Sequence, residues 1–431
     1  MSAVLTMATW LESASAAAPA FLQQPWLQAF RIQQLEKFLA RGLPTRQEEW
    51  WKYTNVASLG KTDFSAPVIP TKAGTYTDKW TSSTILLVFE NGYFSQKMSN
   101  THLLPPEVIL SPLSSAIQTH ENLIKPYLLQ QLDGQRHPFT YLNSALMIEG
   151  TFLQIPKNCI IPYPIHLLFL NTGQNKFISC PRNIIVAHAG AQVKIIEEHT
   201  ANQAEDYFTN VVTELHAYPN ARIDYYKLQS EHVTATHIAN IRVQQKQDSC
   251  VSTFFVDDGS CLAREDLTVD LHESGAACHM NGLYLLKHDE QQIDNHIYVD
   301  HAATHCTSSM LYKGILNNKS RAVFNGKVYV HPRAQQTNAQ QANHNLLLSS
   351  DAEVNTKPEL EIYADDVKCA HGATVGQLDV DALFYLRARG IEKEAALKLL
   401  AQAFTAEVMQ KITDPAIRDY IQQRVSNYAD L

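Results

Sequence analysis

The sequence predicts a mainly β fold with helical ends. From about residue 150 onward, short runs rich in β-branched and aromatic residues recur every dozen or so residues, separated by turn residues such as Asn220 and Gly259. Within the runs, apolar and polar residues alternate, as at Ala239, Ile241 and Val243, which is the period-two pattern of half-buried strands. No long helical pattern interrupts roughly two hundred residues, which excludes a doubly wound α/β fold.

Three architectures remain consistent with this series of strands: a sandwich, a propeller and a β-solenoid. A compact sandwich rarely requires so many strands in one unbroken series, so the pattern favours a solenoid. Periodicity alone does not distinguish the three.

Residues 1–150 are expected to form an N-terminal region that is helical or irregular, with one short hairpin. The stretch "PWLQAFRIQQLEKFLARGLP" predicts an amphipathic helix that ends at Gly42 and Pro44. The stretch "TILLVFENGYFS" predicts the hairpin, with Asn91 and Gly92 as its turn. Between them, "RQEEWWKYT" (46–54) is interpreted as a local packing cluster of aromatic and charged groups.

The strand-rich region is assigned to residues 151–377, and a helical domain to residues 378–431. Asp379 is a plausible N-cap for the first of three C-terminal helices, and Asp414 and Pro415 begin the third. The second and third helices carry apolar stripes. These stripes must be covered, and either the β core or a partner protein can cover them.

Composition excludes several classes of protein. The net charge is 35 − 43 = −8, which argues against nucleic-acid binding. The longest apolar run, around "CIIPYPIHLLFL", is too short and too interrupted to span a bilayer. The first 25 residues contain no Lys or Arg, so no secretion signal is expected. A soluble, cytoplasmic protein is therefore predicted.

Motifs of the common enzyme classes are absent from the sequence. It contains no P-loop for ATP, and none of the patterns G-x-G-x-x-G, G-x-S-x-G or H-E-x-x-H. Its seven cysteines are scattered without C-x-x-C or zinc-finger spacing, so we expect no disulfide framework and mostly buried thiols.

Cys369 and His371 form the one Cys/His pair whose spacing suits joint action. Residues two apart in a strand project from the same face, whereas the adjacent pairs Cys278-His279 and His305-Cys306 would split between faces. Thiolate and imidazole both suit iron. Two ligands do not complete a metal site, so the others would have to come from another strand or another chain.

A carbohydrate-active enzyme built on a β-solenoid is the main rival from a different class. It would require carboxylates that converge on one face. The candidates are adjacent pairs, which again split between faces, and they are interpreted as solvated turn acids: Asp257-Asp258, Glu265-Asp266 and Asp365-Asp366.

Three stretches resemble the SufB/SufD family of iron–sulfur cluster assembly proteins. Residues 364–404, "ADDVKCAHGATVGQLDVDALFYLRARGIEKEAALKLLAQAF", are similar to the C-terminal signature of the family, and residues 279–316 to its middle. "RQEEWWKYT" is similar to the N-terminal motif of the SufD branch. The resemblance implies a right-handed parallel β-helix between a helical N-terminal region and a small C-terminal helical domain. A SufB-like paralogue is the alternative within the family.

The resemblance also implies partners and a cargo. The chain would be a non-catalytic scaffold that pairs with SufB through the β-helix, forms a homodimer when alone, and docks the ATPase SufC through its C-terminal helices. His371, with Cys369 as the second choice, would hold a transient iron–sulfur cluster shared with SufB. Reduced flavin would be the electron source of the complex, although no flavin site is identified. The residues expected to contact SufC are Leu399, Leu400, Phe404, Ile417, Tyr420 and Ile421.

Overall fold

The computed structural model describes residues 24–65, 84–130, 133–172, 176–202 and 206–428. Segment 1–23, on which the expectation of no secretion signal mainly rests, lies outside these residues. Among the helices that the structure does describe, none is long and apolar enough to cross a membrane.

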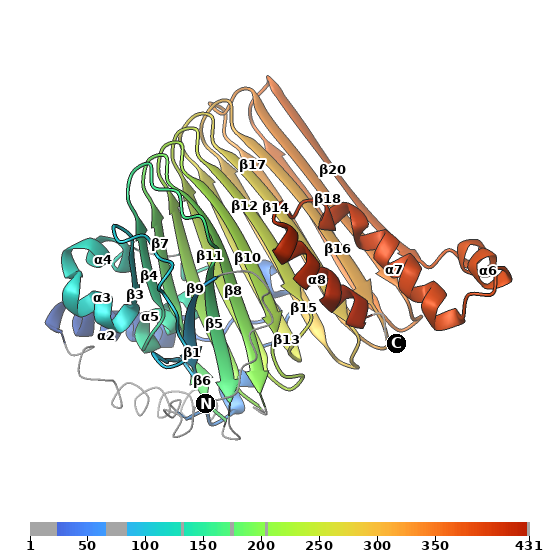
Figure 1. Cartoon of the computed structure of the whole chain (residues 1–431), viewed down its shortest axis with the longest axis horizontal. Helices are drawn as coiled ribbons and strands as arrows, with labels where there is room; N and C mark the ends of the chain where they lie inside the picture. Colours follow the sequence, from blue (N-terminus) through green and yellow to red (C-terminus); the bar gives the residue numbers. More distant parts are fainter. Residues whose placement is uncertain (1–23, 66–83, 131–132, 173–175, 203–205, 429–431) are drawn as a thin grey trace.

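Two long sheets face each other and form a parallel β-solenoid (Figure 1). Through the coils, successive strands alternate between the sheets, so each coil adds one strand to each. Neighbouring strands within a sheet are parallel, except in the two pairs β1–β2 and β3–β4 at the first coils. The predicted solenoid is therefore confirmed, and the sandwich and the propeller are excluded.

The strands lie in a fixed order across each sheet. In the first sheet they are β2 (Tyr93–Phe94), β1 (Ile85–Glu90), β5 (Ile165–Thr172), β8 (Gln192–Asn202), β10 (Arg222–Ser230), β12 (Cys250–Asp257), β14 (Ala277–Leu286), β16 (Thr307–Leu316), β18 (Thr337–Leu347) and β20 (Val367–Gln377). In the second they are β19 (Glu353–Ile362), β17 (Arg321–Val330), β15 (Gln292–His301), β13 (Leu262–Leu271), β11 (Thr236–Gln245), β9 (Phe208–Ala217), β7 (Arg182–Ala187), β4 (Thr151–Ile155) and β3 (Ile109–Pro112), with β6 (Ile178–Ser179) beside β9.

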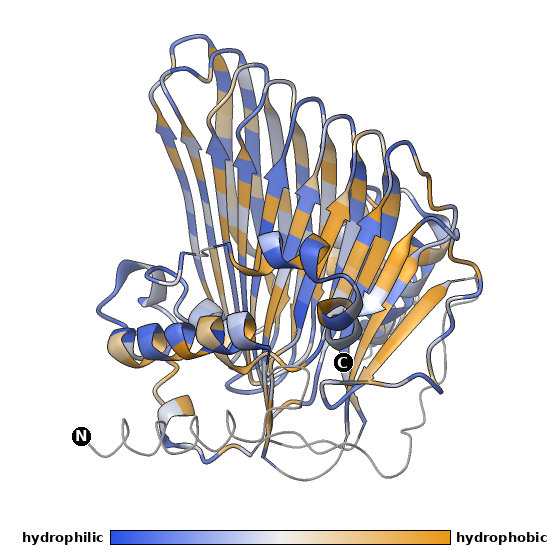
Figure 2. Ribbon diagram, turned by 90° about the vertical axis from the view of Figure 1, so that its left-hand side faces the viewer, coloured by the Kyte–Doolittle hydropathy of each residue, from blue (hydrophilic) through white to orange (hydrophobic). Residues whose placement is uncertain are grey.

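The alternation of apolar and polar residues places one continuous core between the sheets. Ala239, Ile241 and Val243 all lie in this core, as the period-two pattern predicts. Figure 2 shows the same alternation as orange and blue bands along the strands. The chain turns between strands at left-handed residues such as Asn220 (φ 61°) and Asp248 (φ 55°), because Asn and Asp tolerate this conformation better than most side chains.

The N-terminal region covers the outer face of the second sheet. Its helices are α2 (Pro25–Arg41), η2 (Glu49–Trp51), η3 (Leu59–Lys61), α3 (Leu113–Thr119), α4 (Glu121–Leu128) and α5 (Phe139–Leu146). The predicted helix before Gly42 is confirmed as α2. Trp51 is buried in a cluster with Phe139 and Phe208, and its ring stacks 3.8 Å from the Arg264 guanidinium.

The predicted hairpin is confirmed as β1 and β2. Asn91 (φ 51°) and Gly92 (φ 78°) form its turn, and both adopt the positive φ that this type of turn requires. Strand β1 also pairs in parallel with β5, so it is part of the first sheet of the solenoid.

The C-terminal helices are α6 (Val380–Ala388), α7 (Lys393–Met409) and α8 (Pro415–Tyr428). The predicted N-cap of α6 is confirmed, because the Asp379 side chain accepts hydrogen bonds from the amides of Asp381 and Ala382. Helix α8 and the end of α7 lie on the outer face of the first sheet, whereas α6 extends away from the solenoid (Figure 1). The domain boundaries at 150/151 and 377/378 stay predictions.

Glu149 links the N-terminal region to the first coil and gives a testable pH dependence. The amide and hydroxyl of Ser114 donate to its carboxylate at 2.9 and 2.6 Å. Burial outweighs these hydrogen bonds and raises the pKa of Glu149 from 4.5 to about 6. The folded state therefore binds more protons than the unfolded state in this window, so the contribution to stability is complete below pH 4.5 and is lost as the pH rises through 6.

We expect this loss to amount to about 2 kcal/mol between these two pH values. Glu149→Gln should remove that part of the pH dependence, because Gln carries no ionisable proton. Urea unfolding of both proteins between pH 4 and 7 measures the difference. Parallel pH curves for the two proteins would contradict the assignment.

Candidate functional site

The last coil of the solenoid leaves two strand edges without a neighbour among the described residues, β19 in one sheet and β20 in the other. An edge strand carries unpaired backbone N–H and C=O groups that another chain can pair with. Strand β19 limits such pairing with Pro358, which lacks an N–H, and with several charged side chains. Strand β20 is mostly exposed, carries one charged residue, Lys368, and is therefore the more open edge.

Cys369 and His371 lie on β20, and the register determines where they point. They align with Ala339 and Gln341 of β18, both of which are buried and face the interior of the solenoid. Parallel strands in register keep the facing of aligned residues, so Cys369 and His371 also face the solenoid axis, at its open end. The predicted parity of this pair is confirmed.

The two side chains differ in their exposure to solvent. Cys369 packs partly against the last layer of the core, and this burial raises the pKa of its thiol. His371 is exposed, and Gly372 beside it has open space where a side chain would stand. An incoming chain can therefore approach the partly buried thiol and the exposed imidazole together. It would have to supply further ligands for a metal or cluster.

The other Cys/His pairs have the structural roles that their spacing predicts. Cys278 is fully buried in the core, whereas the His279 ring lies outside and contacts Ser309 Oγ at 2.8 Å. Cys306 is buried, and its thiol lies 3.3 Å from the Glu273 carbonyl. The expectation of mostly buried thiols is wrong, because only three of the seven cysteines are buried.

The six residues expected to contact SufC do not form one exposed surface. Ile417, Tyr420 and Ile421 are buried against the chain's own first sheet, together with Leu228 and Val256. Tyr420 also donates to Glu198 Oε1 at 2.8 Å, which ties α8 to β8. In this arrangement the stripe on α8 is covered by the β core, the first of the two possibilities that the sequence left open.

The three predicted residues on α7 are less covered. Leu399 is 46% exposed, Leu400 is half-buried, and Phe404 packs against the cluster beneath α8. Lys313 lies over the Phe404 ring at 4.9 Å and donates to the Phe404 carbonyl at 2.9 Å. Of the six, Leu399 is therefore the one with a largely free side chain.

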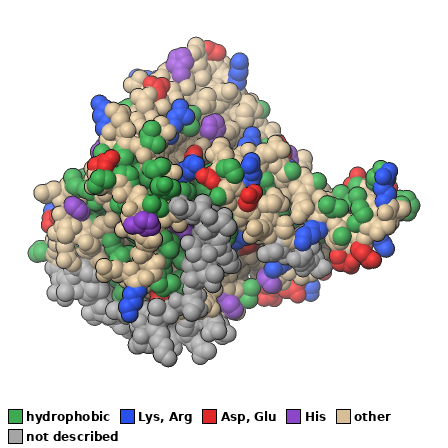
Figure 3. Space-filling model, in the orientation of Figure 1, with side chains coloured by type: hydrophobic (Ala, Val, Ile, Leu, Met, Phe, Trp, Pro, Cys, Tyr) green, Lys and Arg blue, Asp and Glu red, His purple; other side chains and the backbone are tan. Residues whose placement is uncertain are grey.

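Helix α6 carries the exposed apolar surface that sequence reasoning missed. Val380 and Phe384 are each 73% exposed and Tyr385 is 56% exposed, and α6 has no buried residue. Figure 3 shows apolar side chains gathered on the part of the molecule that projects from the solenoid. The signal was present in "VDALFYLRAR", but it resembles the apolar stripe of an ordinary packed helix.

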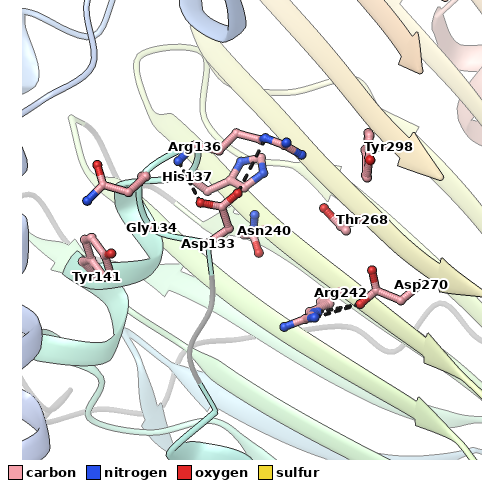
Figure 4. Close-up of a pocket in the computed structure, with 11 residues that line it drawn as sticks. Asp133, Gly134, Arg136, His137, Tyr141, Asn240, Arg242, Thr268, Asp270 and Tyr298 are labelled. Atoms are coloured by element: carbon pink, nitrogen blue, oxygen red, sulfur yellow. Dashed lines mark hydrogen bonds and ion pairs between the residues drawn. The ribbon is translucent and has the colours of Figure 1, made fainter. Parts of the chain in front are cut away.

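A cavity of about 520 Å³ lies between the loop before α5 and the outer face of the second sheet (Figure 4). Its two arginines are already paired, Arg136 with Asp133 at 3.6 Å and Arg242 with Asp270 at 2.9 Å. The remaining lining is mostly polar. These residues do not form the apolar slot that a flavin ring system requires, so we assign no flavin to this cavity.

The carboxylates weighed for a carbohydrate-active enzyme do not converge on an accessible face, because Asp257 and Glu265, which lie near each other, are both enclosed in the core. Glu265 and Asp266 are buried, not solvated as the sequence suggested, and they pair with Lys227 and Arg264 on opposite faces of β13. Asp257 is also buried. Salt bridges within the fold therefore account for Glu265 and Asp266, and the structure gives no support to the enzyme alternative.

Comparison with known proteins gives the family. The model of the SUF system FeS cluster assembly SufBD core domain matches residues 169–404, and that of the SufBD protein N-terminal region matches residues 20–167. An iron–sulfur cluster assembly SufBD family protein of Synechocystis is 34% identical over 89% of this chain and 87% of its own length.

Two relatives carry the name iron–sulfur cluster assembly protein SufD. The protein from Escherichia coli is 28% identical over 91% of both chains, and that from Bacillus subtilis is 26% identical over 90% of this chain and 91% of its own. The chain therefore belongs to the SufBD family of iron–sulfur cluster assembly proteins.

Proposed function

We propose that this chain is the SufD-type scaffold of a cytoplasmic assembly complex, with no catalytic turnover of its own. It would pair with a SufB-type subunit along β20, and with a second copy of itself when isolated. The observation that carries the proposal is the exposed β20 edge, on which Cys369 and His371 face the same way at the open end of the core.

The nascent iron–sulfur cluster is the cargo of this junction. His371 would bind iron or sulfide directly because its imidazole is exposed, and Cys369 would serve as a second ligand once pairing alters its surroundings. The partner would supply the remaining ligands, since an imidazole and a thiolate do not complete a four-coordinate site. Electrons would reach the junction from reduced flavin bound elsewhere in the complex.

A SufC-type ATPase would supply the energy by binding to the C-terminal helices. The exposed residues of α6 and Leu399 of α7 offer it an apolar surface, and α7 and α8 are anchored to the first sheet through Lys313 and Tyr420. Movement of the ATPase would thus be transmitted to the solenoid. This requires the ATPase to bind one arrangement of the paired scaffolds more tightly than the other.

The test is His371→Ala in cells that lack their own SufD and express the two partners. We expect the variant to fold and to co-purify with both partners, but to lose cluster maturation, measured as the activity of an iron–sulfur enzyme. His344→Ala is the matched control, because His344 lies on the neighbouring strand β18 and contacts Thr374 without facing the core. Normal maturation with His371→Ala would refute the site.

A further inference from the structure

A second group of potential metal ligands lies on the outer face of the second sheet, away from β20. Asp270 of β13 aligns in register with Asp300 of β15 and with Tyr329 of β17. The residues that follow them, Leu271, His301 and Val330, are fully buried, so the aligned side chains point outward. His272 follows the end of β13, and its ring lies beside both carboxylates.

We propose that Asp270, His272 and Asp300 bind a divalent transition metal. His272 Nε2 lies 3.5 Å from Asp300 Oδ2 and 4.0 Å from Asp270 Oδ1, and the three potential ligand atoms all lie within 4.8 Å of one another. Ligand atoms about 2.1 Å from a tetrahedral ion are about 3.4 Å apart from one another. Side-chain rotations that move each ligand atom by less than about an ångström would therefore bring all three within bonding distance of one ion.

The neighbouring residues orient both carboxylates for this role. Arg242 holds Oδ2 of Asp270 at 2.9 Å, which leaves Oδ1 directed at His272. His331 Nε2 holds Oδ1 of Asp300 at 2.7 Å, which leaves Oδ2 directed at His272. The His331 ring packs edge-on against Tyr329 at 4.7 Å. Such outer contacts fix ligand orientation in known metal sites.

The donor set selects the class of ion. One imidazole and two carboxylates suit Zn²⁺, Fe²⁺ and Co²⁺, whereas Mg²⁺ and Ca²⁺ prefer oxygen ligands alone. Asp270, Asp300 and Arg242 together carry a net charge of −1, which favours a cation. Because the His272 side chain is 55% exposed, the ion can enter from solvent and the fourth position stays open. An open site suits reversible binding of metal more than permanent structural binding.

The test uses the full-length chain carrying His371→Ala and Cys369→Ala, so that the β20 pair cannot contribute. Zn²⁺ binding is measured by calorimetry, and Co²⁺ binding by its visible absorption. We expect one ion per chain, an affinity lowered about 100-fold or more by His272→Ala or Asp300→Asn, and lowered about tenfold by His331→Gln, which acts through Asp300. A tenfold excess of Mg²⁺ should not displace the bound Co²⁺, so the visible absorption should stay unchanged.

His288→Ala is the control, because His288 is an exposed histidine in a turn outside this group. It should bind both ions as the parent does, and circular dichroism should show that every variant is folded. Absence of binding at micromolar Zn²⁺ and Co²⁺, or equal affinity in the parent and His272→Ala, would overturn the proposal. The measurement needs no partner and no cluster, so its result is independent of the proposed scaffold function.

Discussion

Replacing Lys227 with methionine will lower the free energy of unfolding by about 3–5 kcal/mol, because it leaves buried acids without their cation. The Lys227 ammonium is fully buried inside the solenoid, 2.5 Å from Glu265 Oε1 and 2.8 Å from His237 Nε2. His237 in turn contacts Glu231 Oε2 at 2.6 Å. Methionine has a similar volume, so the expected loss comes from charge and hydrogen bonding and not from a cavity.

The pKa shifts show how closely this interior is balanced. Burial alone would discharge Lys227, but Glu265 and its acidic neighbours outweigh burial and raise the pKa of the ammonium. Burial and the nearby Glu265 carboxylate raise the pKa of Asp257. Without Lys227, only His237 would remain to reduce the repulsion between the Glu265 and Asp257 carboxyl groups.

Urea unfolding followed by circular dichroism measures the loss. Lys194→Met is the matched control, because Lys194 pairs with Asp414 at 2.7 Å while its side chain is 37% exposed, and solvent reduces such a pair to about 1 kcal/mol or less. Adding Glu265→Gln to Lys227→Met should restore part of the stability, because the double variant no longer buries the Glu265 carboxylate without its cation. Equal destabilisation by Lys227→Met and Lys194→Met would show that the buried network is not held by this cation.

The buried ion pairs could not be predicted from the sequence, whereas the strands could. The period-two pattern identifies the strands and the parity of Cys369 and His371, because both depend only on local spacing. The sequence favours solvated turn acids for Glu265 and Asp266, because charged residues seldom lie fully buried. The buried position of Glu265 follows from Lys227, 38 residues earlier in sequence, which only the stacking of coils brings beside it.

The same limit applies to the proposed metal site and to the apolar surfaces of the C-terminal helices. Asp270 and Asp300 lie 30 residues apart in sequence, and nothing in either segment indicates that one coil places them in register. The apolar stripes of the C-terminal helices are predictable, but not which surface covers each, because an apolar stripe packs equally well on a sheet of the same chain or on a partner protein. The structure places α8 on the sheet and leaves the apolar side chains of α6 exposed.

Replacing Phe384 with aspartate should therefore weaken the proposed docking of a SufC-type ATPase without destabilising the chain. An aromatic anchor at the centre of an interface commonly contributes about 2 kcal/mol or more, so we expect binding to weaken at least about 30-fold. The side chain is 73% exposed in the isolated chain, so the midpoint of thermal unfolding should not change. Calorimetric titration of the purified ATPase into the chain measures the affinity.

Two comparisons make this result specific to α6. Ile160→Asp introduces the same charge at an isoleucine that is 60% exposed in the loop before β5, and it should leave the affinity unchanged. Ile421→Asp should behave differently from both, because Ile421 of α8 is fully buried against the first sheet and a charge there would detach the helix and lower the stability. If Phe384→Asp binds the ATPase as tightly as the parent, the docking surface does not include the exposed apolar residues of α6.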